Sequence, residues 1–269
     1  MTTATLPAPA PARRLGTAAA LRNACTLGWR SVLKIRTNPE DLFGLWLQPI
    51  MYLVLFTYVF GGSLAPSVHV YLQLALPGIL VLSVVFATLG TGMMLSQDVA
   101  TGVFDRFRAL PIARWAPLAG AILGDMVRYV ITVAVTIGFG MILGFRIATS
   151  PLAAAMGCLL LLVFAFAMCW FSAMIGMLVK TATGVQLWGF LLMFPLVFGS
   201  NILTQTDKMP GWLQAFVKVN PVTYLTQAER ALLAGAGQAE PNVIRSLLWA
   251  LAIFVVFAPL AVAAYRRKT

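Results

Sequence analysis

Residues 72–143 decide the fold, because two long apolar runs flank a short charged stretch there. The first run is LQLALPGILVLSVVFATLGTGMML (residues 72–95), and the second extends from about Leu118 to Leu143. Runs of about 18 or more apolar residues are long enough to cross a lipid bilayer as helices. Between them stands SQDVATGVFDRFRALPIARWAPLAG (residues 96–120), which is rich in Asp and Arg although charged residues make up only 10% of the 269-residue chain. The region therefore predicts two membrane helices joined by a charged loop.

The rest of the chain repeats this pattern and predicts an all-α integral membrane protein with six transmembrane helices. Hydrophobic residues make up 60% of the chain, against roughly 45–50% in a soluble domain. The predicted spans cover residues 42–61, 72–95, 118–143, 152–179, 185–203 and 243–264. We expect residues 38–269 to form the six-span membrane domain. Residues 1–14 are rich in Pro and Ala and predict a disordered tail, not a secretory signal.

Residues 15–37 have the pattern of an amphipathic helix at the membrane surface. Apolar side chains recur at helical spacing through Leu21, Cys25 and Trp29, whereas Arg30 and Lys34 lie on the opposite side. A basic amphipathic helix of this kind lies flat at the level of the lipid headgroups. An ordinary solvated helix is the alternative interpretation.

The distribution of Lys and Arg predicts the orientation in the membrane. If both termini are cytoplasmic, thirteen of these residues lie inside and five lie outside, which agrees with the positive-inside rule. The charged stretch 96–120 then faces the cytoplasm. The segment between the fifth and sixth spans lies outside, where GWLQAFVKV and PVTYLTQAERALL predict two re-entrant or surface helices.

The sequence lacks the motifs of several enzyme classes and of metal sites. It contains no GxxxxGK[ST], GxSxG or HExxH motif, and its three cysteines and one histidine form no metal-binding pattern. The formal net charge is +11, and the basic residues lie at the edges of apolar runs. This placement is typical of topology signals and not of a nucleic-acid surface. We therefore expect no catalytic activity, no bound metal and no nucleic-acid partner.

Asp125 and Arg128 are the charged residues that lie deepest in a predicted span. An ion-driven transporter usually needs buried acidic or histidine side chains as relays, and this sequence offers few. Asp125 and Arg128 are three residues apart and share one helix face. They form either a structural ion pair near the interface or a gating or substrate contact.

The charged stretch predicts a short amphipathic helix of its own. In TGVFDRFRALP, Val103, Phe107 and Leu110 fall on one side, with Phe104 beside them, and Pro111 ends the helix. Asp105, Arg106 and Arg108 occupy the other side. Such a helix either lies on lipid or docks a cytoplasmic partner.

Two motifs carry a resemblance to a known family. The order D98-VAT-G102-VFDRFRALPIAR114, continued by GDMVR at residues 124–128, resembles the cytoplasmic loop of type-2 ABC exporter membrane subunits. PGWLQAFVKVNPVTYLTQAERALLAG (residues 210–235) is similar to the outer re-entrant segment of that family. Within it, the chain looks most similar to the daunorubicin-resistance type of drug-export permease.

The resemblance implies half of an ATP-driven exporter in a bacterial plasma membrane. Two permease chains, identical or related, would dock two copies of a P-loop ATPase, which would bind the ATP and Mg, and the cargo would be a hydrophobic or amphipathic compound. A lipid or glycan exporter and an ion-driven secondary transporter are the alternatives. The residues expected to couple to the ATPase are Asp98, Gly102, Phe104, Asp105, Arg106, Phe107 and Arg108.

Aromatic side chains on two spans are candidates for the substrate pathway, because a site for varied drugs should be apolar and adaptable. The twelve methionines add deformable surface. An aromatic stripe can equally pack against a neighbouring helix or lipid. The candidate residues are Trp46, Gln48, Tyr52, Phe56, Phe190, Phe194 and Phe198.

Overall fold

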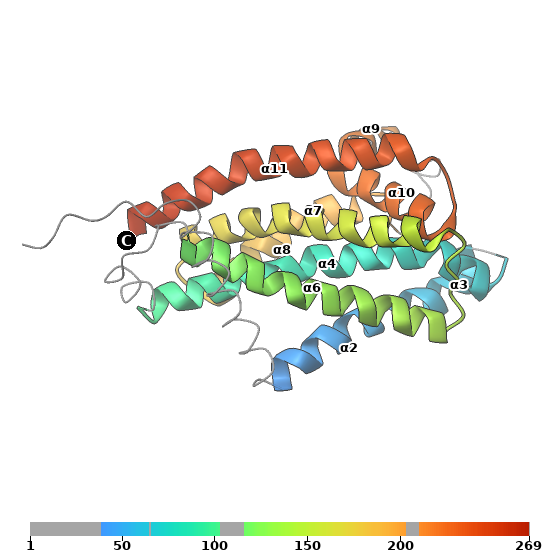
Figure 1. Cartoon of the computed structure of the whole chain (residues 1–269), viewed down its shortest axis with the longest axis horizontal. Helices are drawn as coiled ribbons and strands as arrows, with labels where there is room; N and C mark the ends of the chain where they lie inside the picture. The colour runs from blue at the N-terminus through green and yellow to red at the C-terminus, as the bar shows by residue number, and fades with distance from the viewer. Residues whose placement is uncertain (1–38, 65, 103–115, 203–209, 269) are drawn as a thin grey trace, which may run out of the picture.

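The computed structural model describes residues 39–64, 66–102, 116–202 and 210–268, and every regular element within these ranges is a helix. The long helices run side by side, and α9 and α10 gather at the end of the bundle opposite the C-terminus (Figure 1). The predictions for residues 1–14 and 15–37, and for Phe104, Asp105, Arg106, Phe107 and Arg108, lie outside the described residues. The elements are α2 (Pro39–Leu55), the π-helix η1 (Phe56–Phe60), α3 (Gly61–Leu64), α4 (Val68–Ala100), α6 (Ala116–Ile142), α7 (Pro151–Leu178), α8 (Ala182–Phe198), α9 (Gly211–Val219), α10 (Pro221–Ala234) and α11 (Ala239–Lys268).

Within the described ranges, four helices are long and apolar enough to cross a membrane. They cover Val68–Ala100, Leu118–Ile142, Pro151–Leu178 and Ala239–Arg267, and they coincide with the second, third, fourth and sixth predicted spans. The first and fifth predicted spans correspond to shorter apolar helices, Trp46–Phe60 and Ala182–Phe198. The chain is thus a multi-pass, helical membrane protein, whereas a count of six crossings stays a prediction.

Helix α4 lies at the centre of the bundle. It packs against α6, α7, α8 and α10, and 83% of its most apolar window is buried, compared with 11% for α11. At the crossing of α4 and α7, a Cβ added to Gly92 would lie 2.4 Å from the Ser172 carbonyl oxygen. A Cβ on Gly176 would lie 2.3 Å from the Gly92 carbonyl oxygen. Glycine at these two positions therefore sets how closely the helices approach.

Helix α2 is attached to the rest of the bundle more loosely than α4. It contacts α4 and α6, and it diverges from the long helices at its N-terminal end (Figure 1). Pro49 lies inside α2, and the chain continues through the π-helical turn η1. Such turns interrupt regular helical geometry and occur frequently at functional sites.

Helix α10 is bound into the bundle by polar contacts at both of its ends. At its start, Asn220 Oδ1 accepts the Val222 N–H at 2.9 Å, while Asn220 Nδ2 donates to the Leu196 and Gly199 carbonyls at 2.6 and 3.1 Å. At its end, Gly235 has a φ of +67°, a left-handed conformation that closes helices without strain in glycine. Helices α9 and α10 cover the two segments predicted to form helices, and Trp212 of α9 is 75% exposed. Most side chains of α10 are buried.

Candidate functional site

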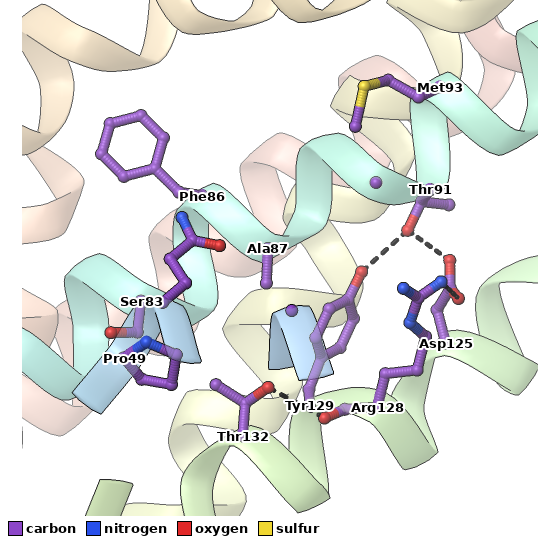
Figure 2. A pocket seen from close by; sticks show the side chains of 13 residues that line it. Pro49, Ser83, Phe86, Ala87, Thr91, Met93, Asp125, Arg128, Tyr129 and Thr132 are labelled. Carbon is purple, nitrogen blue, oxygen red and sulfur yellow. Dashed lines mark hydrogen bonds and ion pairs between the residues drawn. The ribbon is translucent and has the colours of Figure 1, made fainter. Parts of the chain in front are cut away.

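A cavity of about 240 Å³ lies between α2, α4 and α6. Its lining residues on α4 fall between Ser83 and Met93, and those on α6 fall between Asp125 and Thr132. One wall carries buried polar side chains and another carries Phe86 (Figure 2). Its lining residues are Gly44, Gln48, Pro49, Ser83, Phe86, Ala87, Gly90, Thr91, Met93, Asp125, Arg128, Tyr129 and Thr132.

A chain of hydrogen bonds crosses from α7 through α6 and α4 to the Asp125 carboxylate. The Thr91 hydroxyl donates to Asp125 Oδ2 at 2.6 Å, so its single proton is used there. The Tyr129 hydroxyl, 2.7 Å from Thr91 Oγ1, must then be the donor of that contact. The Cys169 thiol donates to Tyr129 Oη at 3.3 Å. All four groups are buried, and bonds that run in one direction strengthen one another in such surroundings.

Arg128 supplies positive charge beside this carboxylate. Its Nη1 lies 3.6 Å from Asp125 Oδ1, and its side chain is 22% exposed, compared with 3% for the Asp125 side chain. The contact is longer than the 2.7–2.9 Å of a strong charge-assisted hydrogen bond. The structure thus brings the two predicted residues together as a loose pair whose basic member is partly exposed.

The hydroxyl group of Ser83 is a further polar group in the cavity wall. Its hydroxyl oxygen is buried, lines the cavity and makes no hydrogen bond within the described residues. Burying a hydroxyl without a partner is unfavourable. A guest molecule in the cavity could therefore gain a hydrogen bond from Ser83.

An aromatic column connects this cavity to α8. Phe86 stacks on Phe190 with 5.5 Å between ring centroids and lies 6.4 Å from the Phe198 ring. Phe194 lies between them, 5.4 Å from Phe190 and 4.5 Å from Phe198. Phe190 is 47% exposed, so the column packs against α4 and still presents ring surface outward.

The candidates on the first predicted span separate into two groups. Gln48 lines the cavity and its amide donates to Tyr52 Oη at 3.2 Å. Phe56 is buried in η1 against Tyr52 and Phe60, and Trp46 is 52% exposed and does not line the cavity.

Two of the residues predicted to couple to an ATPase are described, and both lie where α4 ends. Asp98 is in the last turn of α4, and Gly102 follows with a φ of +68°. The Gly102 N–H donates to the Val99 carbonyl at 3.2 Å. The segment after Gly102 is therefore connected by a short, bonded turn to the helix that bears Thr91.

Sequence reasoning missed two buried charges on α10. Glu229 and Arg230 lie in the segment between the fifth and sixth predicted spans, which was predicted to lie outside the membrane. Both side chains are buried. Arg230 Nε donates to the Leu74 carbonyl at 3.0 Å and Nη2 to the Ile202 carbonyl at 2.8 Å. Burial lowers the pKa of Arg230 to about 10, partly opposed by Tyr71, so it stays charged at neutral pH. Burial alone raises the pKa of Glu229 to about 8.

A signal for Glu229 was present in the sequence. Val222, Leu225, Glu229 and Leu232 recur at helical spacing, so the carboxyl group stands in the apolar stripe of α10. Within the described residues no group of three or more His, Cys, Asp or Glu side chains could hold a metal ion.

Membrane transport subunits commonly have this architecture, a multi-pass helical bundle with a partly polar cavity. The sequence pattern of the ABC-2 type transporter family matches residues 22–233, and the chain belongs to this family.

Relatives with named functions agree with this assignment. The chain is 39% identical to the daunorubicin resistance ABC transporter permease protein DrrB1 of Streptomyces coeruleorubidus, over 96% of this chain and 89% of the relative. It is 28% identical to the probable doxorubicin resistance ABC transporter permease protein DrrC of Mycobacterium tuberculosis, over 85% and 82% of the two chains. It is 29% identical to the putative transport permease ycf38 of Cyanophora paradoxa, over 76% and 71%.

Proposed function

We propose that this chain is the permease subunit of an ATP-dependent exporter that moves a hydrophobic or amphipathic compound out of the cytoplasm. The observation that carries the proposal is the cavity between α2, α4 and α6, where the buried Asp125 and its partner Arg128 share the lining with Phe86. Such a site combines apolar surface with a few oriented polar groups, as small-molecule sites generally do. The printed names of two relatives, for daunorubicin and doxorubicin resistance, support a drug as cargo.

The position of the predicted coupling residues suggests how ATP could act on this cavity. The chain between α4 and α6 joins the helix that carries Thr91 to the helix that carries Asp125. If a partner ATPase displaces that connecting segment, α4 shifts relative to α6 and the hydrogen bond from Thr91 to Asp125 is strained or broken. A two-state rearrangement of this kind needs only a ligand that favours one of the states.

We further propose the assembly that family membership implies. Two permease chains, identical or related, dock two P-loop ATPase subunits, which bind ATP and Mg. The chain crosses a bacterial plasma membrane six times with both termini in the cytoplasm, so that the cavity opens from the cytoplasmic half. The permease itself has no catalytic site.

The test is purification of the tagged chain from its native membrane in mild detergent, with identification of what co-elutes and an ATPase assay. A P-loop ATPase at about equal stoichiometry, stimulated by amphipathic compounds, supports the exporter. A chain that elutes alone, without ATPase activity under conditions that preserve complexes, favours an ion-driven transporter instead.

A variant tests the coupling role directly. Phe107→Ala combined with Arg108→Glu should abolish compound efflux while insertion into the membrane and the thermal stability of the purified chain remain unchanged. Unchanged efflux in the double variant contradicts docking of an ATPase at this segment.

A further inference from the structure

The Glu229 carboxyl group is buried against the backbone of a neighbouring helix. Glu229 is 0% exposed, and neither carboxylate oxygen has a hydrogen-bond partner within the part of the chain that the structure describes. Its Oε2 lies 3.0 Å from the point that a Cβ would occupy on Gly157 of α7. The carboxyl group thus fills the space that glycine leaves on α7.

No described positive group neutralises this carboxyl group. Arg230 follows it in sequence but extends to the Leu74 and Ile202 carbonyls. On α11, the Arg245 guanidinium lies over the Tyr224 ring, 5.3 Å from its centroid, and Glu240 is acidic and exposed.

The other described helices that pack against α10 also provide no positively charged side chain beside the carboxyl group. Cys158 of α7 is the titratable neighbour that interacts electrostatically with Glu229. Tyr71 of α4 interacts with Arg230, and His69 lies against Gly144. Lys218 of α9 is exposed, and α8 contains no titratable side chain.

A buried carboxylate without a counter-ion or donor is strongly unfavourable, whereas the neutral acid is tolerated. We propose that Glu229 is a proton-binding site that locks α10 onto α7. With the proton bound, the neutral carboxyl group stays packed on Gly157. When the proton passes to water, the carboxylate requires hydration, and α10 separates from α7 at this point.

The raised pKa of Glu229, about 8, places this transition near neutral pH, in agreement with the geometry. The consequence extends beyond one side chain, because α10 also holds α4 and the end of α8 through Arg230 and Asn220. Loss of the proton therefore loosens the junction of several helices at the end of the bundle opposite the cavity.

The native cysteines provide the experiment. In the full-length chain in lipid nanodiscs, with Cys25→Ser as background, the rate of maleimide labelling at Cys158 reports separation of α10 from α7. Labelling of the fully buried Cys169 reports global unfolding. Site-resolved mass spectrometry distinguishes the two.

The rates are compared with those of Glu229→Gln, which cannot ionise, at each pH. The comparison cancels the intrinsic increase of thiol reactivity with pH. We expect the ratio of native to Glu229→Gln rates at Cys158 to be about 1 at pH 6 and to rise at least about fivefold by pH 9, because the ionised fraction grows tenfold per pH unit below the pKa. A negative charge at Glu229 by itself slows the attack of a nearby thiolate, so acceleration identifies opening of the helix contact.

Three results would overturn the proposal. These are a ratio that remains near 1 across the range, a ratio that falls with pH, and labelling of Cys169 in parallel with Cys158. Glu240→Gln, which removes an exposed carboxyl group at the start of α11, is the matched control and should follow the native chain. If Glu229→Gln does not assemble, Glu229→Met provides a second neutral reference.

Discussion

Among the residues whose burial the structure describes, two acidic side chains are buried, in opposite halves of the bundle, and their surroundings differ. Asp125 is 2% exposed and accepts a hydrogen bond from Thr91 beside Arg128. Glu229 is 0% exposed and has neither a donor nor a cation among the described residues. The first carboxyl group has a hydrogen-bond donor and a nearby cation and lines a cavity, so it is suited to contact a guest. The second is stable only as the neutral acid, so it is suited to respond to protons.

Removal of the partnered carboxylate should have the largest effect. Asp125→Ala leaves Arg128 without its counter-ion and Thr91 without its acceptor, in a region where uncompensated charge is costly. We expect efflux of amphipathic compounds to fall at least about tenfold and the free energy of unfolding to fall by about 2 kcal/mol, less than for a fully buried pair because Arg128 is partly exposed.

Efflux is measured in cells that also express the partner ATPase and is normalised to the amount of permease in the membrane. Glu240→Gln, an exposed acid, controls for the loss of one carboxyl group. Normal efflux by Asp125→Ala would remove Asp125 from the site.

The unpartnered carboxyl group should make stability depend on pH. The pKa of Glu229 is about 8 in the folded chain and about 4.5 in an exposed glutamate, so the folded state retains the proton to higher pH. The stabilisation is complete below about pH 4.5 and is lost as the pH rises toward 8, at up to about 1.4 kcal/mol per pH unit.

Thermal unfolding in detergent between about pH 5 and pH 8 measures this slope. Glu229→Gln should flatten the curve and unfold at a higher temperature than the native chain at the alkaline end. Parallel curves for the two proteins would show that Glu229 does not titrate in this range.

Replacing Thr91 by valine removes the hydroxyl group that donates to Asp125 and keeps the shape of the side chain. Thr91→Val removes the hydrogen bond that Asp125 accepts from Thr91 and the acceptor of the Tyr129 hydroxyl, which should cost about 1–3 kcal/mol and reduce efflux less than Asp125→Ala. Thr132→Val is the matched control, because Thr132 also lines the cavity but donates to the Arg128 carbonyl of its own helix at 3.0 Å. Equal effects of the two substitutions would argue against a special role for Thr91.

The smallest effect concerns the glycine beside Glu229. Gly157→Ala places a methyl group 3.0 Å from Glu229 Oε2 and 3.3 Å from Leu232 Cβ, which should cost about 1 kcal/mol through overpacking. In a Glu229→Ala background the same change should cost less, because the closer of the two contacts is then absent. A double-mutant cycle in thermal unfolding measures the difference, and additive effects would show that the two residues do not touch.

The sequence predicted the features that depend on local pattern. Hydrophobic runs predicted the four long helices, and the spacing of Asp125 and Arg128 predicted that both share one face. The burial of Glu229 could not be predicted in the same way, because it depends on Gly157 of α7, which belongs to a different helix. The contact between Thr91 and Tyr129 could not be predicted either, because it joins two different helices. The hydropathy of α10, averaged over its length, is also low, and this average hides the apolar stripe in which Glu229 stands.

The bond from Arg230 to Leu74 also bears on how the protein is made. The two residues are 156 positions apart, so α4 is synthesised and inserted long before its partner on α10 emerges from the ribosome. Pro77 lacks the N–H that would bind the residue 73 carbonyl, and the neighbouring Leu74 carbonyl receives the Arg230 guanidinium only at the end. The centre of the bundle is thus completed by one of its last segments, and long-range closure of this kind is slow. A nascent chain that stops before α10 would therefore present an unfinished core to the quality-control proteases of the membrane.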